Sequence, residues 1–156
     1  MKFNDPIELD MEIFVTKGKF DCIQIGQTKE WILNNFPAPD NRYDKDRIWS
    51  YGSFEFHFSK NQLSTIFCGD LSLTVSDGIK INKWIFDECV TLSKFIAILN
   101  NNRIDFRSRN SPNDCSEVEV MILSSKVNLC FFNGEDIKDI NDLRLHSFSL
   151  SEYNDG

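Results

Sequence analysis

The stretch Arg47–Cys68, RIWSYGSFEFHFSKNQLSTIFC, carries the most regular pattern in this chain. Phenylalanine recurs there at every second position, as Phe54, Phe56 and Phe58, with polar residues between the rings. Successive side chains of a β-strand point to opposite faces of a sheet, so a period of two predicts a strand with one apolar and one polar face. A short polar turn and a second apolar run follow. The stretch therefore predicts an antiparallel meander.

Two short helices are predicted outside this meander. Thr28 precedes Lys29–Leu33 and Thr91 precedes Leu92–Leu99, and a threonine hydroxyl in such a position accepts a backbone N–H of the first helical turn. Apolar residues recur at helical spacing in the second segment, which predicts a helix with one buried face. Other segments predict strands at 12–25, 71–75, 104–106, 118–122, 127–131 and 143–150, and a polar loop over 108–116.

Two parts of the chain resemble each other. Glu55–Cys68 can be aligned with Glu119–Phe132 without a gap. The two threonine caps, Thr28 and Thr91, are separated by almost the same number of residues. Self-similarity at a fixed spacing is typical of repeated units, although alternating hairpins also resemble one another without duplication. We predict one compact α+β domain over 1–156, with an antiparallel meander sheet and short helices packed on one face. It contains two tandem helix-plus-hairpin units, at about 20–78 and 84–134, and a C-terminal extension over 135–156.

The charge balance narrows the class of partner. The 156 residues include 24 acidic and 17 basic side chains, which gives a formal net charge of −7. Nucleic-acid binding needs clustered Lys and Arg against the phosphates, and the one small basic cluster, at 103–109, also contains an aspartate. A net negative protein associates fastest with a basic partner. We therefore predict a protein partner, such as a basic toxin domain, and no nucleic acid.

The sequence also predicts a cytoplasmic location without membrane association. No segment approaches the roughly 18 consecutive apolar residues of a membrane helix, and the first residues, MKFNDP, lack the apolar run of a signal peptide. The five cysteines agree with a reducing compartment, because their number is odd and no two of them lie close together in the sequence. They are Cys22, Cys68, Cys89, Cys115 and Cys130.

The residue types that carry chemistry form no recognisable catalytic or metal-binding motif. His57 and His146, the two histidines, lie on alternating segments without a nucleophile motif. The cysteine spacing fits neither a zinc site nor a redox pair, and the glycines stand singly, so no phosphate-binding loop is present. We predict a non-enzymatic protein with no catalytic residue, no metal and no cofactor. A histidine-dependent enzyme or a ligand-binding module remains as an alternative.

One region resembles a known family. It contains IGQTKE at 25–30, PAPD at 37–40 and RIWSYG at 47–52, with an apolar helix between the first two. This order resembles the repeat of the β-lactamase-inhibitor-protein-like fold, which small outer-membrane assembly lipoproteins share. The resemblance covers about residues 20–70. It implies helices laid against an antiparallel sheet, and binding of other proteins through the open sheet face. In general character the chain is similar to bacterial immunity proteins that neutralise toxins.

The predicted binding surface is the polar face of the sheet. If the phenylalanines point toward the helices, the acidic residues and the histidine between them point outward. Trp49 and Tyr51 are anchors of the interface if their own face is open, and core residues otherwise. The predicted partner-binding residues are Trp49, Tyr51, Glu55, His57, Glu117 and Glu119. We predict an immunity protein that neutralises a cognate bacterial toxin by covering its site; the alternative is an adaptor or structural subunit of a larger protein assembly.

Overall fold

The computed structural model describes residues 7–87, 90–111, 114–132 and 139–152. Within these ranges the helices are α1 (Met11–Lys17), α2 (Lys29–Asn35) and α3 (Leu92–Asn101), with short 3-10 helices at Trp84–Asp87 and Ile140–Asp142. The strands of the first half are β1 (Ile7–Asp10), β2 (Asn41–Tyr43), β3 (Ile48–Tyr51), β4 (Phe54–Ser59), β5 (Gln62–Cys68) and β6 (Ile79–Asn82). Those of the second half are β7 (Phe106–Ser111), β8 (Asp114–Ile122), β9 (Asn128–Phe132) and β10 (Arg144–Ser151).

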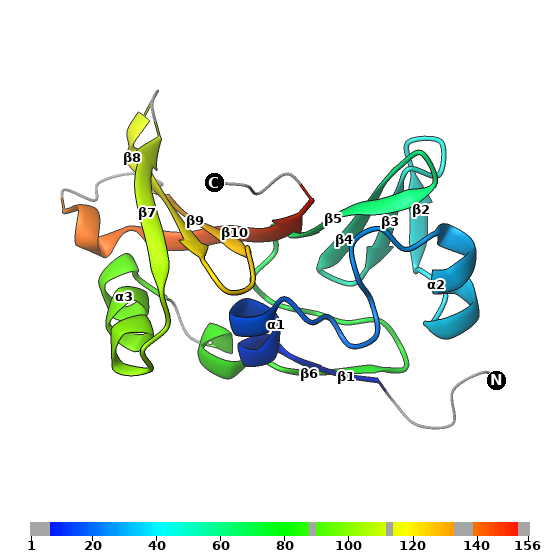
Figure 1. The fold of residues 1–156 in the computed structure, drawn as a ribbon, viewed down its shortest axis with the longest axis horizontal. Helices are drawn as coiled ribbons and strands as arrows, with labels where there is room; N and C mark the ends of the chain where they lie inside the picture. The colour runs from blue at the N-terminus through cyan, green and yellow to red at the C-terminus, as the bar shows by residue number, and fades with distance from the viewer. Residues whose placement is uncertain (1–6, 88–89, 112–113, 133–138, 153–156) are drawn as a thin grey trace.

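Eight of these strands form one antiparallel sheet, in the order β2-β3-β4-β5-β10-β9-β8-β7. β10, the last strand in sequence, joins the two halves of the sheet, because it pairs with β5 on one side and with β9 on the other (Figure 1). β1 and β6 pair in parallel as a separate two-stranded sheet. The predicted α+β class with an antiparallel sheet is confirmed, and so is the strand near 143–150.

The helices pack on one face of the large sheet. The ring of Phe14 in α1 lies 5.9 Å from that of Phe148 in β10, and the ring of Phe95 in α3 lies 5.5 Å from that of Phe131 in β9. The end of α2 packs against β3 in the same way. Figure 1 shows α1 and α3 together below the strands. The phenylalanines of β4 belong to this covered face, where all three are buried.

The prediction of strands over 12–25 is wrong. Residues 12–17 belong to helix α1, and residues 18–25 form turns with a single isolated bridge between Phe20 and Ile23. The Asp10 side chain accepts hydrogen bonds from the backbone N–H groups of Glu12 and Ile13, at 2.9 and 3.2 Å, and so caps the helix. Gly18 ends it in the left-handed conformation, at φ 70°. The buried residues of α1 fall at i, i+3 and i+4, so the sheet covers a helical stripe and not an alternating one.

Two other predicted segments differ from the structure. Residues 71–75 form no strand. The strand that follows them in sequence is β6, which is extended because it pairs with β1 along its whole length. Within the range 108–116, predicted as a polar loop, residues 108–111 belong instead to β7 and residues 114–116 to β8. β7 is an edge strand, and polar and charged side chains are common on edge strands because they discourage pairing with other chains.

The two halves of the sheet have a similar order of elements. A threonine-capped helix precedes antiparallel strands in both halves: α2 comes before β2, β3, β4 and β5, and α3 before β7, β8 and β9. The ungapped alignment holds through the turn, where Phe58 pairs with Leu63 and the Ile122 N–H donates to the Val127 carbonyl, but it fails farther along the strands. Phe56 pairs with Ile66, so the alignment would pair Val120 with Cys130, but Val120 pairs with Leu129. The difference arises because the register of β4 and β5 shifts after His57. An internal duplication stays a prediction.

The turn between β2 and β3 is left-handed and is held by one carboxylate. Residues 44–46 all have positive φ, between 50° and 67°, a conformation that costs L-residues roughly 1–2 kcal/mol each. The Asp46 carboxylate accepts a hydrogen bond from the indole N–H of Trp49 at 2.7 Å, and pairs with Lys29 at 3.4 Å and Arg42 at 3.6 Å. The bond from Trp49, followed by the contacts with the two cations, holds the pKa of Asp46 below its usual range.

Asp46→Asn is expected to lower the free energy of unfolding at neutral pH by less than about 1 kcal/mol, because the carboxylate is 40% exposed and its ion pairs are screened. Since the folded-state pKa is depressed, this stabilisation is present above the ordinary aspartate pKa of about 3.9 and is lost as the pH falls through the folded-state value. Urea unfolding of both chains at neutral pH and near pH 3 measures the difference. A difference that is equal or larger at the acid pH would contradict the prediction.

Candidate functional site

The sheet face that lies away from the helices, which we call the open face, is mostly polar. Directly opposed residues of antiparallel strands point to the same face, so the pairing defines a row of side chains across all eight strands. From β2 to β7 this row is Asn41, Ser50, Glu55, Phe67, Ser149, Asn128, Met121 and Arg107. The open face therefore presents mainly amides, hydroxyls and charges, with single apolar side chains between them.

Four of the predicted partner-binding residues lie on the open face, in two pairs. Glu55 and His57 are neighbours on β4, and the His57 Nε2 is 2.9 Å from the Glu55 Oε2. Glu117 and Glu119 are neighbours on β8. Four strand spacings of about 4.8 Å separate β4 from β8, so the two pairs are roughly 19 Å apart. The structure places all four side chains on one surface but not in one cluster.

Trp49 and Tyr51 lie in the core and cannot be anchors on the surface. Their exposed fractions are 0% and 1%, because β3 turns both rings toward the helices. The Tyr51 hydroxyl donates a hydrogen bond to the carbonyl of Pro37 at 2.9 Å, and burial raises the pKa of Tyr51. The alternation in the sequence showed that the two rings share a face. It did not show which face the helices cover.

The pair on β8 has partners on the neighbouring strands. The Arg109 guanidinium donates a hydrogen bond to Glu119 at 2.7 Å, and the Cys130 thiol donates one to Glu117 at 2.7 Å. Burial, followed by the contact with Glu117, raises the pKa of Cys130 to about 12, so its thiol stays protonated at neutral pH. A protonated thiol is a poor nucleophile and a poor metal ligand. Both glutamates of this pair already accept a hydrogen bond within the chain.

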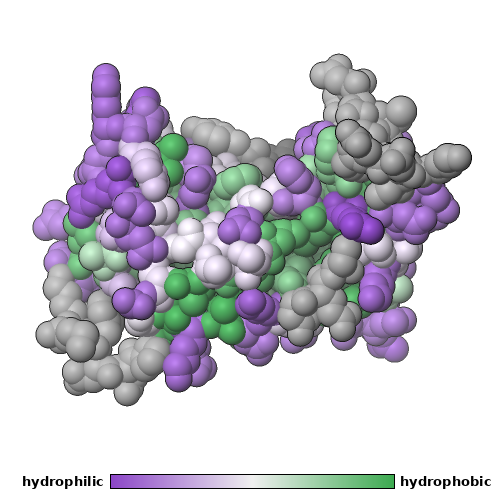
Figure 2. Space-filling view, turned by 180° about the vertical axis from the view of Figure 1, so that it is seen from behind, coloured by the Kyte–Doolittle hydropathy of each residue, from purple (hydrophilic) through white to green (hydrophobic). Residues whose placement is uncertain are grey.

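Aromatic rings are exposed on the same face. Tyr43 on β2 is 51% exposed, and Phe132 on β9 is 36% exposed with its ring 5.6 Å from that of His146. Exposed aromatic rings among polar side chains are typical of surfaces that bind other proteins. Apolar surface also crosses the middle of the molecule where it is seen from behind, with polar side chains around it (Figure 2).

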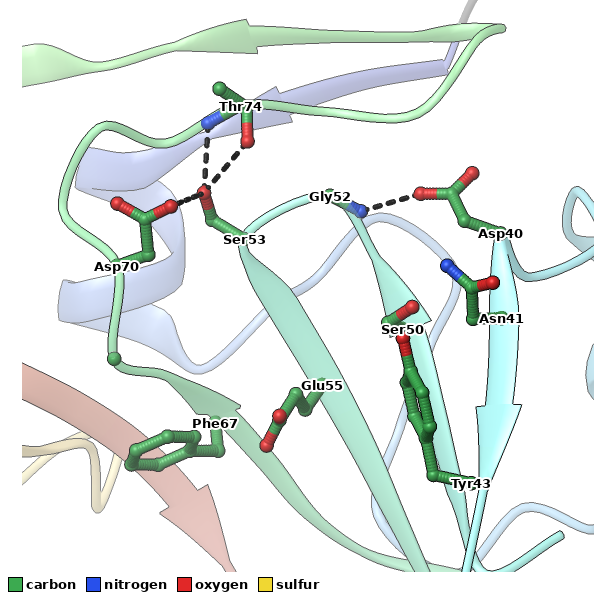
Figure 3. A pocket seen from close by; sticks show the side chains of 11 residues that line it. Asp40, Asn41, Tyr43, Ser50, Gly52, Ser53, Glu55, Phe67, Asp70 and Thr74 are labelled. Carbon is green, nitrogen blue, oxygen red and sulfur yellow. Dashed lines mark hydrogen bonds between the residues drawn. The ribbon is translucent and has the colours of Figure 1, made fainter.

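A hollow of about 510 Å³ lies at one end of the open face, where β2 to β5 meet residues 69–74 (Figure 3). Ser50 and Glu55 form its floor, and the rings of Tyr43 and Phe67 stand on either side of them. The Glu55 side chain is 40% exposed, so its carboxylate is accessible from solvent. The volume is within the range of about 300–1,000 Å³ that is usual for ligand pockets.

Two aspartates stand at the rim of the hollow. Asp40 accepts hydrogen bonds from the Gly52 N–H and the Ser76 hydroxyl, both at 2.7 Å. Asp70 accepts one from the Ser72 N–H at 3.0 Å, and this bond is the main reason that the pKa of Asp70 lies below its usual range. These donors are neutral, and none of the described residues lining the hollow is basic. The acidic side chains of the lining therefore have no basic lining residue to offset them.

The remaining reactive groups offer little chemistry. Burial raises the pKa of Cys68 to about 12 and that of Cys22 to about 11, so both thiols are protonated at neutral pH. Cys89 and the side chain of Cys115 lie outside the described residues. In the described parts of the chain, no three His, Cys, Asp or Glu side chains are placed to hold a metal ion. No helix in those parts is long and apolar enough to cross a membrane.

Most of the hollow could not be predicted from the sequence. Strict alternation would put Phe67 on the same face as Leu63, but the register shift after His57 turns it to the open face. Asp40 did have a local signal, because an aspartate after two prolines is a common turn residue that can bind backbone N–H groups. The contribution of Asp70 had no local signal, because its place depends on how residues 69–74 return to the sheet.

Comparison with known proteins finds no matching family model, no similar curated protein and no similar solved structure. The resemblance to the β-lactamase-inhibitor-protein-like repeat stays a prediction.

Proposed function

We propose that this chain is a non-enzymatic protein-binding protein that uses its open face, and that it is an immunity protein for a bacterial toxin. The observation that carries the proposal is the character of that face. It is a broad sheet surface with two separate acidic positions, exposed aromatic rings and a negatively charged hollow. A surface of this size can cover the active site of another protein, and its aromatic rings can supply the buried contacts.

The charge of the chain supports a basic partner. The net charge of −7 favours fast association with a positively charged surface. A toxin that acts on nucleic acid needs a basic active site to hold the phosphates. An acidic face that docks over such a site would exclude the substrate without any chemistry of its own. In this proposal the inhibition takes place in the cytoplasm of the producing cell.

A growth-rescue assay tests the proposal. The protein encoded by the neighbouring gene is expressed alone and together with this chain. We expect the neighbour alone to arrest growth, and co-expression to restore growth through a complex that co-purifies. Glu55→Lys combined with Glu119→Lys should abolish the rescue, because it reverses the charge at both acidic positions of the open face. The double variant Glu30→Lys and Asp77→Lys makes the same change in charge at exposed positions outside the sheet, and should still rescue.

The outcomes separate the proposal from its alternative. A harmless neighbour that nevertheless forms a stable complex with this chain would overturn the immunity role and favour an adaptor or structural subunit. Equal loss of rescue in both double variants would overturn the assignment of the open face. Unchanged rescue in both would do the same.

A further inference from the structure

The hollow between Tyr43 and Phe67 combines acidic side chains with aromatic rings, and these two features together suit a particular kind of ligand. Three carboxylates, those of Asp40, Glu55 and Asp70, belong to its lining, and none of its described lining residues carries a positive charge. Aromatic rings stand on both sides of the floor (Figure 3). A group that suits both features is a cation that can also lie against an aromatic face.

The cation on β2 beside the hollow is engaged on the other side of the sheet. Arg42 is on β2 beside the hollow, but its guanidinium lies over the Trp49 ring, 4.9 Å from the centroid, on the helix side of the sheet. It also pairs with Asp46 at 3.6 Å. His57 approaches one oxygen of Glu55, and a carboxylate has about four acceptor positions, so Glu55 can accept further hydrogen bonds from a ligand.

We propose that the hollow is a subsite for an arginine side chain of the protein partner, with its guanidinium bound to the Glu55 carboxylate and lying against an aromatic wall. This inference rests on the proposed function and names the group that the partner presents. Arginine fits better than lysine for two reasons. Its planar guanidinium can donate two parallel hydrogen bonds to one carboxylate, and it stacks on aromatic rings at a lower cost of dehydration than an ammonium group.

The room in the hollow is adequate for such a side chain. Tyr43 and Phe67 stand on β2 and β5, three strand spacings or roughly 14 Å apart. A guanidinium above Ser50 and Glu55 therefore reaches one ring at a time. The rim aspartates remain bound to their backbone donors and contribute charge without having to move.

The test is an NMR titration of the uniformly ¹⁵N-labelled full chain with N-acetyl-arginine methylamide. The matched control ligand is N-acetyl-citrulline methylamide, which has the same shape but no charge. We expect the arginine compound to shift the backbone resonances of Gly52, Ser53, Glu55 and Gly69 with a dissociation constant on the order of 1 mM. The citrulline compound should leave these resonances in place.

Two variants locate the binding. Glu55→Gln keeps the size of the side chain and should weaken arginine binding at least about tenfold, because a hydrogen bond to a charged group is lost. Glu30→Gln makes the same change at an exposed position outside the sheet and should keep the dissociation constant within about twofold. Comparison of the two ligands on the unmodified chain is independent of any effect of a substitution on folding.

Several results would overturn the inference. These are equal shifts with citrulline, shifts spread over the whole surface, or equal weakening by the two variants. Equal affinity for N-acetyl-lysine methylamide would overturn the preference for arginine. The titration uses no partner protein, so its failure is distinct from failure of the growth rescue. If rescue depends on the open face but arginine does not bind the hollow, the proposed function stands and this inference falls.

Discussion

Phe20→Ala is expected to lower the free energy of unfolding by about 3–5 kcal/mol, the usual range for removal of a fully buried phenylalanine ring. Phe20 is 1% exposed and lies in the segment between α1 and α2. Its ring is 5.6 Å from that of Phe14, 5.1 Å from that of Phe54 and 5.5 Å from that of Phe56. It thus joins α1 to the centre of the covered sheet face, and its loss would leave a cavity bordered by other rings.

This loss is large for a domain whose total stability is expected to be about 5–15 kcal/mol. Urea unfolding followed by circular dichroism measures it as a lower midpoint at unchanged slope. Phe132→Ala is the matched control, because the same ring is removed where it is 36% exposed, and it should cost less than about 1 kcal/mol. Equal losses in the two variants would show that Phe20 does not join the helices to the sheet.

Gly52→Ala is expected to destabilise the chain by about 2–5 kcal/mol, the sum of left-handed strain and overpacking. Gly52 has φ 60° in the turn between β3 and β4. An added Cβ would collide with the Thr74 carbonyl oxygen, and would lie 2.7 Å from the Thr74 carbonyl carbon and 2.8 Å from the Val75 Cα. These are backbone atoms, so no side-chain rotation can relieve the contact.

Gly78→Ala separates the two contributions. Gly78 also has positive φ, 84°, but an added Cβ would meet nothing within 4 Å, so this change should cost only about 1–2 kcal/mol of strain. Urea unfolding compares the two variants. Gly52→Ala should also displace residues 74–75 from the rim of the hollow and weaken arginine binding, whereas Gly78→Ala should leave that binding unchanged. Equal destabilisation by both would contradict the close approach at Gly52.

The parts of the fold that depend on local pattern were predictable from the sequence. The alternation of Phe54, Phe56 and Phe58 predicts β4 and its two faces, because side chains along a strand alternate in direction. Thr28 and Thr91 predict the starts of α2 and α3, since each hydroxyl accepts a backbone N–H of the first turn. The start of α1 had a similar signal in Asp10, and Gly18 marked its end, but α1 is short and its pattern was assigned to strands.

The candidate site depended much less on local pattern. Glu55 and His57 could be placed on the polar face from the alternation, and Glu117 and Glu119 by the same argument. The hollow could not be predicted, because its lining comes from β2, β3, β4 and β5 and from residues 69–74, and the spacing of these segments is a matter of tertiary packing.

By itself the sequence determined the acidic charge, the alternating strands and the capped helices, since each of these depends on residues close together in the chain. Only the tertiary structure decided that β10 lies in the middle of the sheet, between β5 and β9. It also decided that Trp49 and Tyr51 are core residues, because the helices cover their side. The pairing of β4 with β5 also decided that Phe67 points to the open face, because its register shifts after His57. Each of these results depends on the free energy of contacts between segments that are far apart in the sequence. A local sequence pattern does not determine those contacts.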